Sequence, residues 1–313
     1  MKSTFLHKVH DKMILGLEDC LFTGAVLLVI HANRTVFHES YGTLGGSGTE
    51  TVTSNTFFDL ASLTKVLCTT LLWIQLESEF PGIIDRSILH WFPDVPEDKA
   101  TITPRHLLAH ASGLPAWRPY YLMASVADPE ESTRVRILNE NLAYTIGRGC
   151  IYSDLGFMLL GLIIQKQLGE GLDTAASKRI YEPLDLNDIM FKPVSQVDRT
   201  AWTRVGERPG LVNDLNCRSM GGVAGHAGLF GTANAVGKLA KELLRSLKSQ
   251  DGFFAQQVAK AFCSRARFTW DSTRALGFDT PSKDGSSCGK KFSPDSIGHT
   301  GFTGVSLWID ISR

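Results

Sequence analysis

The stretch from Phe58 to Leu67 constrains the fold most, because it places a candidate nucleophile at the start of an apolar helix. Leucine, valine and isoleucine recur at helical spacing after Ser62, so we predict a helix that begins at or near this serine. Ser62 and Lys65 then lie on one face of the helix. We expect burial and the positive end of the helix to lower the pKa of Lys65, so that its amine can take the serine proton. The same tetrapeptide also arises by chance, and alone it would mark only a capped surface helix.

The charge balance argues against polyanionic partners. The chain has 313 residues, with 32 Lys and Arg against 32 Asp and Glu, so we expect no nucleic-acid partner and no affinity for an anionic membrane. The most apolar run, from Phe157 to Ile164, is too short for a membrane span. The N-terminus lacks the apolar core of a signal peptide, and the six cysteines are isolated, which favours a reduced cytoplasmic protein. A periplasmic location would follow if a leader has been removed from this sequence.

Periodicity and turn residues predict the order of elements along the chain. A polar turn at Asn33-Arg34 separates two β-rich runs and indicates an antiparallel hairpin. Pro104 is typical of the first position of a helix. Besides the helix at Ser62, the predicted helices cover residues 1–20, 103–110, 155–168, 175–184 and 234–249, and the predicted strands cover residues 25–30, 35–41 and 305–311.

Two other motifs have alternative functional interpretations. His106 and His110 stand four positions apart, which is the spacing of a zinc pair, but no third ligand accompanies them and we favour packed or capping histidines. The glycine-dense segment from Gly221 to Gly231 matches neither a dinucleotide-binding nor a P-loop pattern. We therefore interpret this segment as the wall of a pocket and expect neither a metal nor a nucleotide cofactor.

Three short motifs together resemble those of a known superfamily. They are S-L-T-K at Ser62, Y-S-D at Tyr152 on a loop before a helix, and H-T-G at His299 before a strand. Their order and separation resemble the serine β-lactamase and penicillin-binding-protein superfamily. The chain is most similar to the class C β-lactamase-like group, which includes family VIII esterases and DD-peptidases. The flanking segments 105–115 and 225–230 match as well.

The resemblance implies a role for each motif. Ser62 would be the acylated nucleophile, Lys65 would share or accept its proton, and Tyr152 would relay a proton to the leaving group and help to activate water. The backbone N–H groups of Ser62 and Phe302 would form the oxyanion hole. No metal or nucleotide takes part in this chemistry.

The H-T-G motif and the residue after Tyr152-Ser153 bear on the substrate. His299 stands where many relatives have lysine, which resembles the esterase and peptidase-like subgroups. Thr300 would line the substrate site, and Gly301 must stay small so that the strand can lie beside the substrate. Asp154 stands where the superfamily often has asparagine, and an ionised aspartate accepts hydrogen bonds without donating any. We therefore favour an esterase or DD-peptidase-like activity over an efficient β-lactamase.

The implied fold is α+β, an antiparallel sheet flanked by helices, in a single domain of residues 1–313. Residues 1–60 and 246–313 would build the sheet, and residues 61–245 would form an inserted all-helical subdomain. The sequence ends soon after Trp308, so we expect a further C-terminal strand and helix of the fold to be missing from it. The substrate would be a small-molecule ester, a peptide or a β-lactam. The alternative is a non-catalytic penicillin-binding or scaffold protein that keeps the fold.

Overall fold

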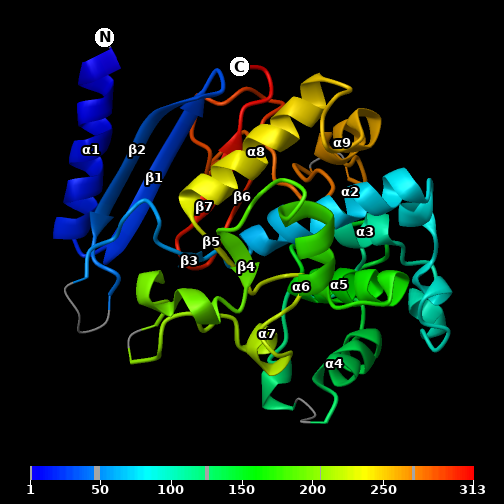
Figure 1. The fold of residues 1–313 in the computed structure, drawn as a ribbon. Coiled ribbons are helices and arrows are strands. Elements are labelled where there is room, and N and C mark those ends of the chain that lie inside the picture. Colours follow the sequence, from blue (N-terminus) through cyan, green and yellow to red (C-terminus); the bar gives the residue numbers. More distant parts are fainter. Residues whose placement is uncertain (1, 46–49, 124–126, 205, 270–271) are drawn as a thin grey trace.

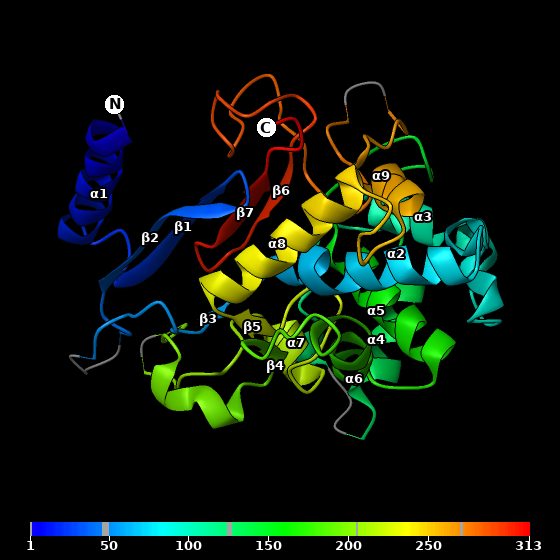
Figure 2. The same ribbon diagram turned by 45° about the horizontal axis from the view of Figure 1, so that its top comes forward.

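The computed structural model describes residues 2–45, 50–123, 127–204, 206–269 and 272–313. Strands from the two ends of the chain lie on the same side of the molecule, and the middle of the chain forms a mainly helical body next to them (Figures 1 and 2). The helices are α1 (Lys2–Glu18), α2 (Thr70–Glu79), α3 (Pro104–Leu108), α4 (Pro129–Leu138), α5 (Asp154–Leu168), α6 (Leu172–Ala176), α7 (Leu215–Ser219), α8 (Ala233–Lys248) and α9 (Gln256–Cys263). The strands are β1 (Gly24–His31), β2 (Arg34–Gly42), β3 (Phe58–Asp59), β4 (Ile189–Phe191), β5 (Leu229–Gly231), β6 (Ile297–Thr300) and β7 (Ser306–Ile309).

The N-terminal hairpin confirms the prediction from the sequence. β1 pairs antiparallel with β2, with Gly24 opposite Gly42 at the open end. Ala32 and Asn33 form the turn, and both have positive φ values of 48° and 64°. Two central residues with positive φ form the turn type that matches the right-handed twist of a hairpin.

The C-terminal strands form a second antiparallel hairpin. β6 pairs with β7, with His299 opposite Leu307. Among the described residues, no hydrogen-bonded ladder joins this hairpin to β1 and β2, so the two ends of the chain contribute two small sheets and not one continuous sheet. The mainly helical part contributes β4 and β5 to a third sheet, in which β5 lies between β3 and β4. The fold is thus α+β as predicted, but its insertion is not entirely helical.

The helix after Ser62 runs through the core and fixes the position of the S-L-T-K motif. The chain is helical from Leu63, takes a π-helical turn over Lys65–Thr69, and continues as α2. The side chain of Trp73 in α2 is completely buried. Most residues of α2 are buried, so this is a core helix and not the capped surface helix that the tetrapeptide alone would mark.

Helix α5 supports the other side of this core. Ser153 caps its first turn by accepting from the N–H of Gly156. Its backbone passes so close to the glycine-dense segment that a Cβ at Gly225 would stand 2.1 Å from the carbonyl oxygen of Phe157. At α8, a Cβ at Gly237 would stand 2.6 Å from Leu28 of β1. Gly225 therefore lets two backbones touch, and Gly237 lets the Leu28 side chain pack on the backbone of α8.

Candidate active site

Ser62 lies in a strained turn between β3 and the core helix. Ala61, just before it, has a positive φ of 43°, which is unusual for a residue with a side chain. The side chain of Asp59 accepts from the N–H of Ala61 at 2.9 Å, and the hydroxyl of Thr64 donates to the carbonyl of Ala61 at 2.6 Å. These bonds hold the strained residue in place. The turn therefore fixes the direction in which the Ser62 hydroxyl points.

Asp59 anchors this turn, and its role was not predicted from the sequence. Its second carboxylate oxygen accepts from the N–H of Asn213 at 2.6 Å, and its carbonyl oxygen accepts from the hydroxyl of Thr303 at 2.7 Å. Burial raises the pKa of Asp59 to about 6, although the two backbone N–H groups oppose this shift. The only signal in the sequence was an acidic residue between the apolar Phe58 and Leu60.

The Lys65 amine lies completely buried beneath Ser62. Its Nζ donates to the Ser62 Oγ at 3.0 Å and to the carbonyl oxygen of His226 at 3.0 Å. It also forms an ion pair with Asp154, whose Oδ1 is 2.8 Å away. Burial lowers the pKa of Lys65, but the charges and hydrogen bonds of Asp154 and Tyr152 outweigh it, so the pKa is raised. The prediction of a lowered pKa was wrong, because Asp154 supplies a partner that the sequence argument had not placed beside the amine.

The Tyr152 ring packs among four charged or aromatic side chains. The Lys65 Nζ lies 5.0 Å from the ring centroid, and the guanidinium carbon of Arg274 lies 5.3 Å from it. The rings of His110 and His299 have centroids 4.7 Å and 5.7 Å from that of Tyr152. The next residue along the chain is tied down too, since the N–H of Ser153 donates to the Nδ1 of His110 at 3.0 Å. Tyr152 thus stands beside Lys65, on the loop where the sequence placed it.

His299 lies at the end of β6 against this tyrosine. Its Nδ1 is 2.7 Å from the carbonyl oxygen of Thr300, which can only accept, so Nδ1 carries the proton. Burial lowers the pKa of His299 to about 3, and the charge of Lys65 adds to the shift. His299 is therefore a neutral acceptor at Nε2, whereas a lysine at this position would supply a positive charge.

Gly301 brings the β6–β7 turn against the Ser62 turn. A Cβ on Gly301 would lie 3.0 Å from the carbonyl oxygen of Leu60 and 3.3 Å from the Cβ of Ala61. Within the turn, the N–H groups of Gly301 and Gly304 are used by hydrogen bonds. Among the described residues, no acceptor pairs with the N–H of Ser62 or Phe302. The two groups expected to form an oxyanion hole are therefore unused within the protein, and the Phe302 side chain itself is 88% exposed.

These residues surround one cleft of about 650 Å³. It brings together every predicted site residue except Lys65, which lies below its floor: Ser62, Tyr152, Asp154, His299, Thr300, Gly301 and Phe302. His226 and Ala227 also line the cleft, which agrees with the interpretation of the glycine-dense segment as a pocket wall. A cleft of this size suits a small molecule or a short peptide.

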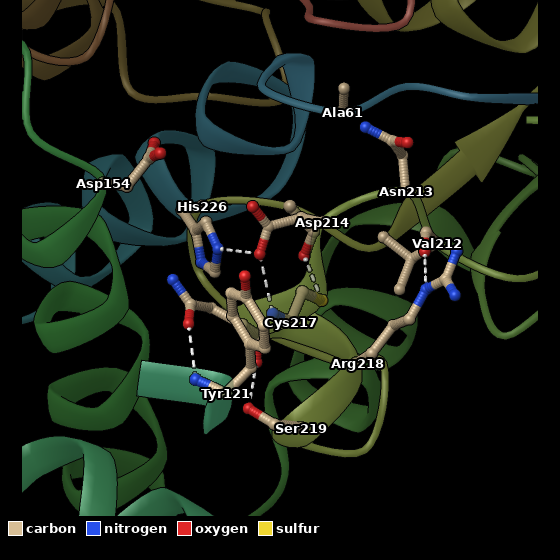
Figure 3. A network of polar contacts seen from close by, with 12 residues as sticks. Ala61, Tyr121, Asp154, Val212, Asn213, Asp214, Cys217, Arg218, Ser219 and His226 are labelled. Carbon is tan, nitrogen blue, oxygen red and sulfur yellow. Dashed lines mark hydrogen bonds and ion pairs between the residues drawn. The ribbon is translucent and has the colours of Figure 1, made fainter. Parts of the chain in front are cut away.

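An aspartate–histidine pair forms a further part of the cleft that the sequence did not predict (Figure 3). Asp214 lies 2.8 Å from the Nε2 of His226 and caps α7 by accepting from the N–H of Cys217 at 2.7 Å. Burial disfavours the charge of Asp214, but His226 and the capped N–H group outweigh it and lower the pKa to about 2. The pair fixes the loop whose carbonyl oxygen, that of His226, holds Lys65.

The histidines that might have formed a zinc pair have other partners. The Nδ1 of His106 accepts from the N–H of Thr103 in the capping box of α3, and the Nδ1 of His110 accepts from the N–H of Ser153. Across the residues that the structure describes, no three His, Cys, Asp or Glu side chains form a group that could hold a metal ion. In the same part of the chain, no helix is both long and apolar enough to cross a membrane.

Comparisons with known proteins match the chain over nearly its full length. The family model described as Beta-lactamase matches residues 13–313. A curated protein of Bacillus subtilis (strain 168) named N-acetylmuramyl-L-alanine amidase is 31% identical over 97% of this chain and 78% of its own length. A protein of Escherichia coli O157:H7 named "Putative D-alanyl-D-alanine carboxypeptidase" is 29% identical over 96% of this chain and 78% of its own.

A solved structure shows the same fold. The crystal structure of a class C beta lactamase superimposes with a TM-score of 0.78, at 20% identity, over 100% of this chain and 91% of its own. The expected superfamily and α+β fold are therefore confirmed. The chain belongs to the beta-lactamase family.

Proposed function

We propose that this protein is a serine hydrolase that cleaves an amide or ester through an acyl-enzyme at Ser62. The observation that carries the proposal is the position of the Ser62 hydroxyl. It lies at the floor of the cleft, 3.0 Å from the buried Lys65 amine and held by a strained turn. A nucleophile within hydrogen-bond reach of a proton-carrying group, which is in turn fixed by a third residue, is the arrangement that covalent catalysis requires.

The reaction would proceed in two steps. In acylation the Ser62 Oγ attacks the substrate carbonyl carbon and loses its proton to the Lys65 and Asp154 pair, and the leaving group departs with a proton. Water then attacks the acyl-enzyme, and Ser62 recovers its hydrogen. The unused N–H groups of Ser62 and Phe302 would stabilise the negative oxygen in both steps, and losing one such donor typically slows a reaction by about a hundredfold or more.

The substrate we favour is an amide of the peptidoglycan type. The names of the two curated relatives describe enzymes that act on N-acetylmuramyl-L-alanine and on D-alanyl-D-alanine, and both names denote the cleavage of an amide bond.

Intact-mass spectrometry tests the nucleophile directly. The protein is incubated with a fluorophosphonate and, separately, with a penicillin, as wild type, as Ser62→Ala and as Ser195→Ala, a matched change at an exposed serine. We expect a mass shift in wild type and in Ser195→Ala, but none in Ser62→Ala. If folded wild-type protein forms no adduct with either reagent, the proposal fails, and the non-catalytic alternative takes its place.

A further inference from the structure

Three oxygen atoms surround the buried amine of Lys65. The Ser62 Oγ and the carbonyl oxygen of His226 each lie 3.0 Å from Nζ, and the Oδ1 of Asp154 lies 2.8 Å from it. A lysine ammonium has three N–H groups and no lone pair, so it can serve all three oxygens at once. A neutral amine has a lone pair that needs a donor, and among these three oxygens only that of Ser62 carries a hydrogen. The ion pair with Asp154 thus favours a charged lysine in the resting site, and this lysine must give up a proton as it takes one from Ser62.

Asp154 is the carboxylate placed to receive that proton. A backbone carbonyl such as that of His226 cannot hold it, whereas a carboxylate can. The other titratable or charged groups near Lys65 are either already bonded, poor bases or cations. Asp214 accepts from His226, His110 accepts from Ser153, His299 has a pKa of about 3 and Arg274 is a cation. The Tyr152 hydroxyl also hydrogen-bonds with Lys65, but it is not a carboxylate. No other described group contacts the Lys65 amine as an anion.

We propose that Asp154 stores the nucleophile's proton during acylation and acts on Ser62 through Lys65. As the Ser62 Oγ bonds to the substrate carbon, its O–H bond breaks and its proton moves to the Lys65 Nζ. One N–H bond of Lys65 breaks at the same time, and that proton moves to the Asp154 carboxylate. Lysine is thus a cation before and after the step, and the negative charge passes from Asp154 to the tetrahedral oxygen. When the intermediate collapses, the proton returns through Lys65 to the leaving group, and Asp154 is a carboxylate again.

This inference rests on the proposed function, and it distinguishes aspartate from asparagine at position 154. An asparagine has the same size, and its oxygen could still accept from Lys65, but it carries no negative charge and cannot hold the proton. In Asp154→Asn the lysine would have to release its proton to solvent before each reaction. The variant should therefore become active only at higher pH, where the free amine forms.

The test follows the rate at which a fluorophosphonate labels Ser62 between about pH 4 and about pH 10, measured by intact mass. We expect Asp154→Asn to be slower by about a hundredfold at neutral pH, the usual scale of a lost acid–base group. The pH below which the labelling rate falls should be about two units or more higher in Asp154→Asn than in the wild type. In Asp154→Glu this pH should stay near the wild-type value. Asp284→Asn is the matched control, because Asp284 is exposed and does not line the cleft, so its pH profile should match that of the wild type.

Parallel profiles for wild type and Asp154→Asn would overturn the inference, since a purely structural loss lowers the rate equally at every pH. A second measurement needs only the wild type, in case the asparagine variant does not fold. If two protons are transferred in the same step, the labelling rate depends on the fraction of D₂O along a curve. A straight line would contradict the proton transfer from Ser62 through Lys65 to Asp154. If wild type is not labelled at Ser62 at all, the proposed function fails. If it is labelled but the profiles are parallel, only the role of Asp154 fails.

Discussion

Gly301 offers a sharp test of how the two halves of the site fit together. In Gly301→Ala the new Cβ would lie 2.5 Å from the Cγ2 of Val305, 3.0 Å from the carbonyl oxygen of Leu60 and 3.3 Å from the Cβ of Ala61. The Val305 side chain can rotate, but the Leu60 oxygen belongs to the backbone of the Ser62 turn. Ordinary van der Waals contact between the Cβ and this oxygen begins at 3.4 Å, so the two backbones must move apart by about 0.4 Å. This displacement carries the N–H of Phe302 away from Ser62.

The size of the effect follows from this displacement. A misplacement of about 1 Å can cost about a hundredfold in rate, so a shift of about 0.4 Å should cost about tenfold, or roughly 1.4 kcal/mol of transition-state stabilisation. Complete loss of the Phe302 donor sets the upper range at about a hundredfold or more. We expect kcat/KM for p-nitrophenyl acetate and the rate of fluorophosphonate labelling to fall together within this range. Overpacking should also lower the free energy of unfolding, by about 1–3 kcal/mol.

A rescue variant separates this mechanism from a general loss of folding. Val305→Ala removes the nearest contact and should recover part of the activity when it is combined with Gly301→Ala. By itself Val305→Ala should stay close to wild type, because its side chain does not line the cleft. If Gly301→Ala keeps the wild-type kcat/KM and labelling rate while its melting temperature is unchanged, the close approach has no catalytic role and our reasoning is refuted.

The buried Asp59 and the half-buried Asp214 should give pH dependences of opposite sign. For Asp59, a pKa raised by burial from 3.8 to about 6 means that the ionised form destabilises the fold by about 3 kcal/mol above pH 6. The free energy of unfolding, measured by urea titration, should thus rise as pH falls from about 7 to about 4. In Asp59→Asn it should change less over this range. The same slope against pH in both proteins would contradict this prediction. For Asp214, a pKa lowered from 3.8 to about 2 gives stability of about 2.5 kcal/mol that is present above pH 4 and lost as pH falls toward 2. The stability difference between wild type and Asp214→Asn should shrink as pH falls from about 4 to about 2, and a constant difference would contradict this prediction.

The sequence predicted the elements that depend on local patterns. The hairpin of residues 24–42, the helix opened by Pro104 and the apolar helix after Ser153 follow from alternation, turn residues and caps, and all three are present. The separation of the two terminal hairpins into different sheets was not predictable in this way. Which strand edges pair depends on contacts between segments far apart in the sequence, and a strand pattern does not name its partner.

In the candidate site, too, the sequence predicted what depends on neighbouring residues and missed what depends on contacts between distant segments. Ser62 and Lys65 could be placed side by side, because residues three positions apart on a helix lie on the same face. Asp214 and His226 could not, since they are 12 positions apart and the short helix α7 and a loop lie between them. The pKa of Lys65 was predicted in the wrong direction for a related reason. Burial and the helix end were local expectations, but Asp154 arrives from a helix about 90 residues further along the chain and reverses the result.

The π-helical turn at Lys65–Thr69 sets a limit on how this motif can be rebuilt elsewhere. It holds one residue more than an α-helical turn, so the segment before it is rotated by about 100° relative to a regular continuation of α2. Deleting one of these five residues would restore an ordinary helix, but it would turn either Lys65 or the apolar face around Trp73 away from its neighbours. Protein engineers who graft the Ser62–Lys65 pair onto an ideal helix would therefore reproduce its sequence spacing without its orientation to the core. The extra residue is a part of the motif that must be copied along with the side chains of Ser62 and Lys65.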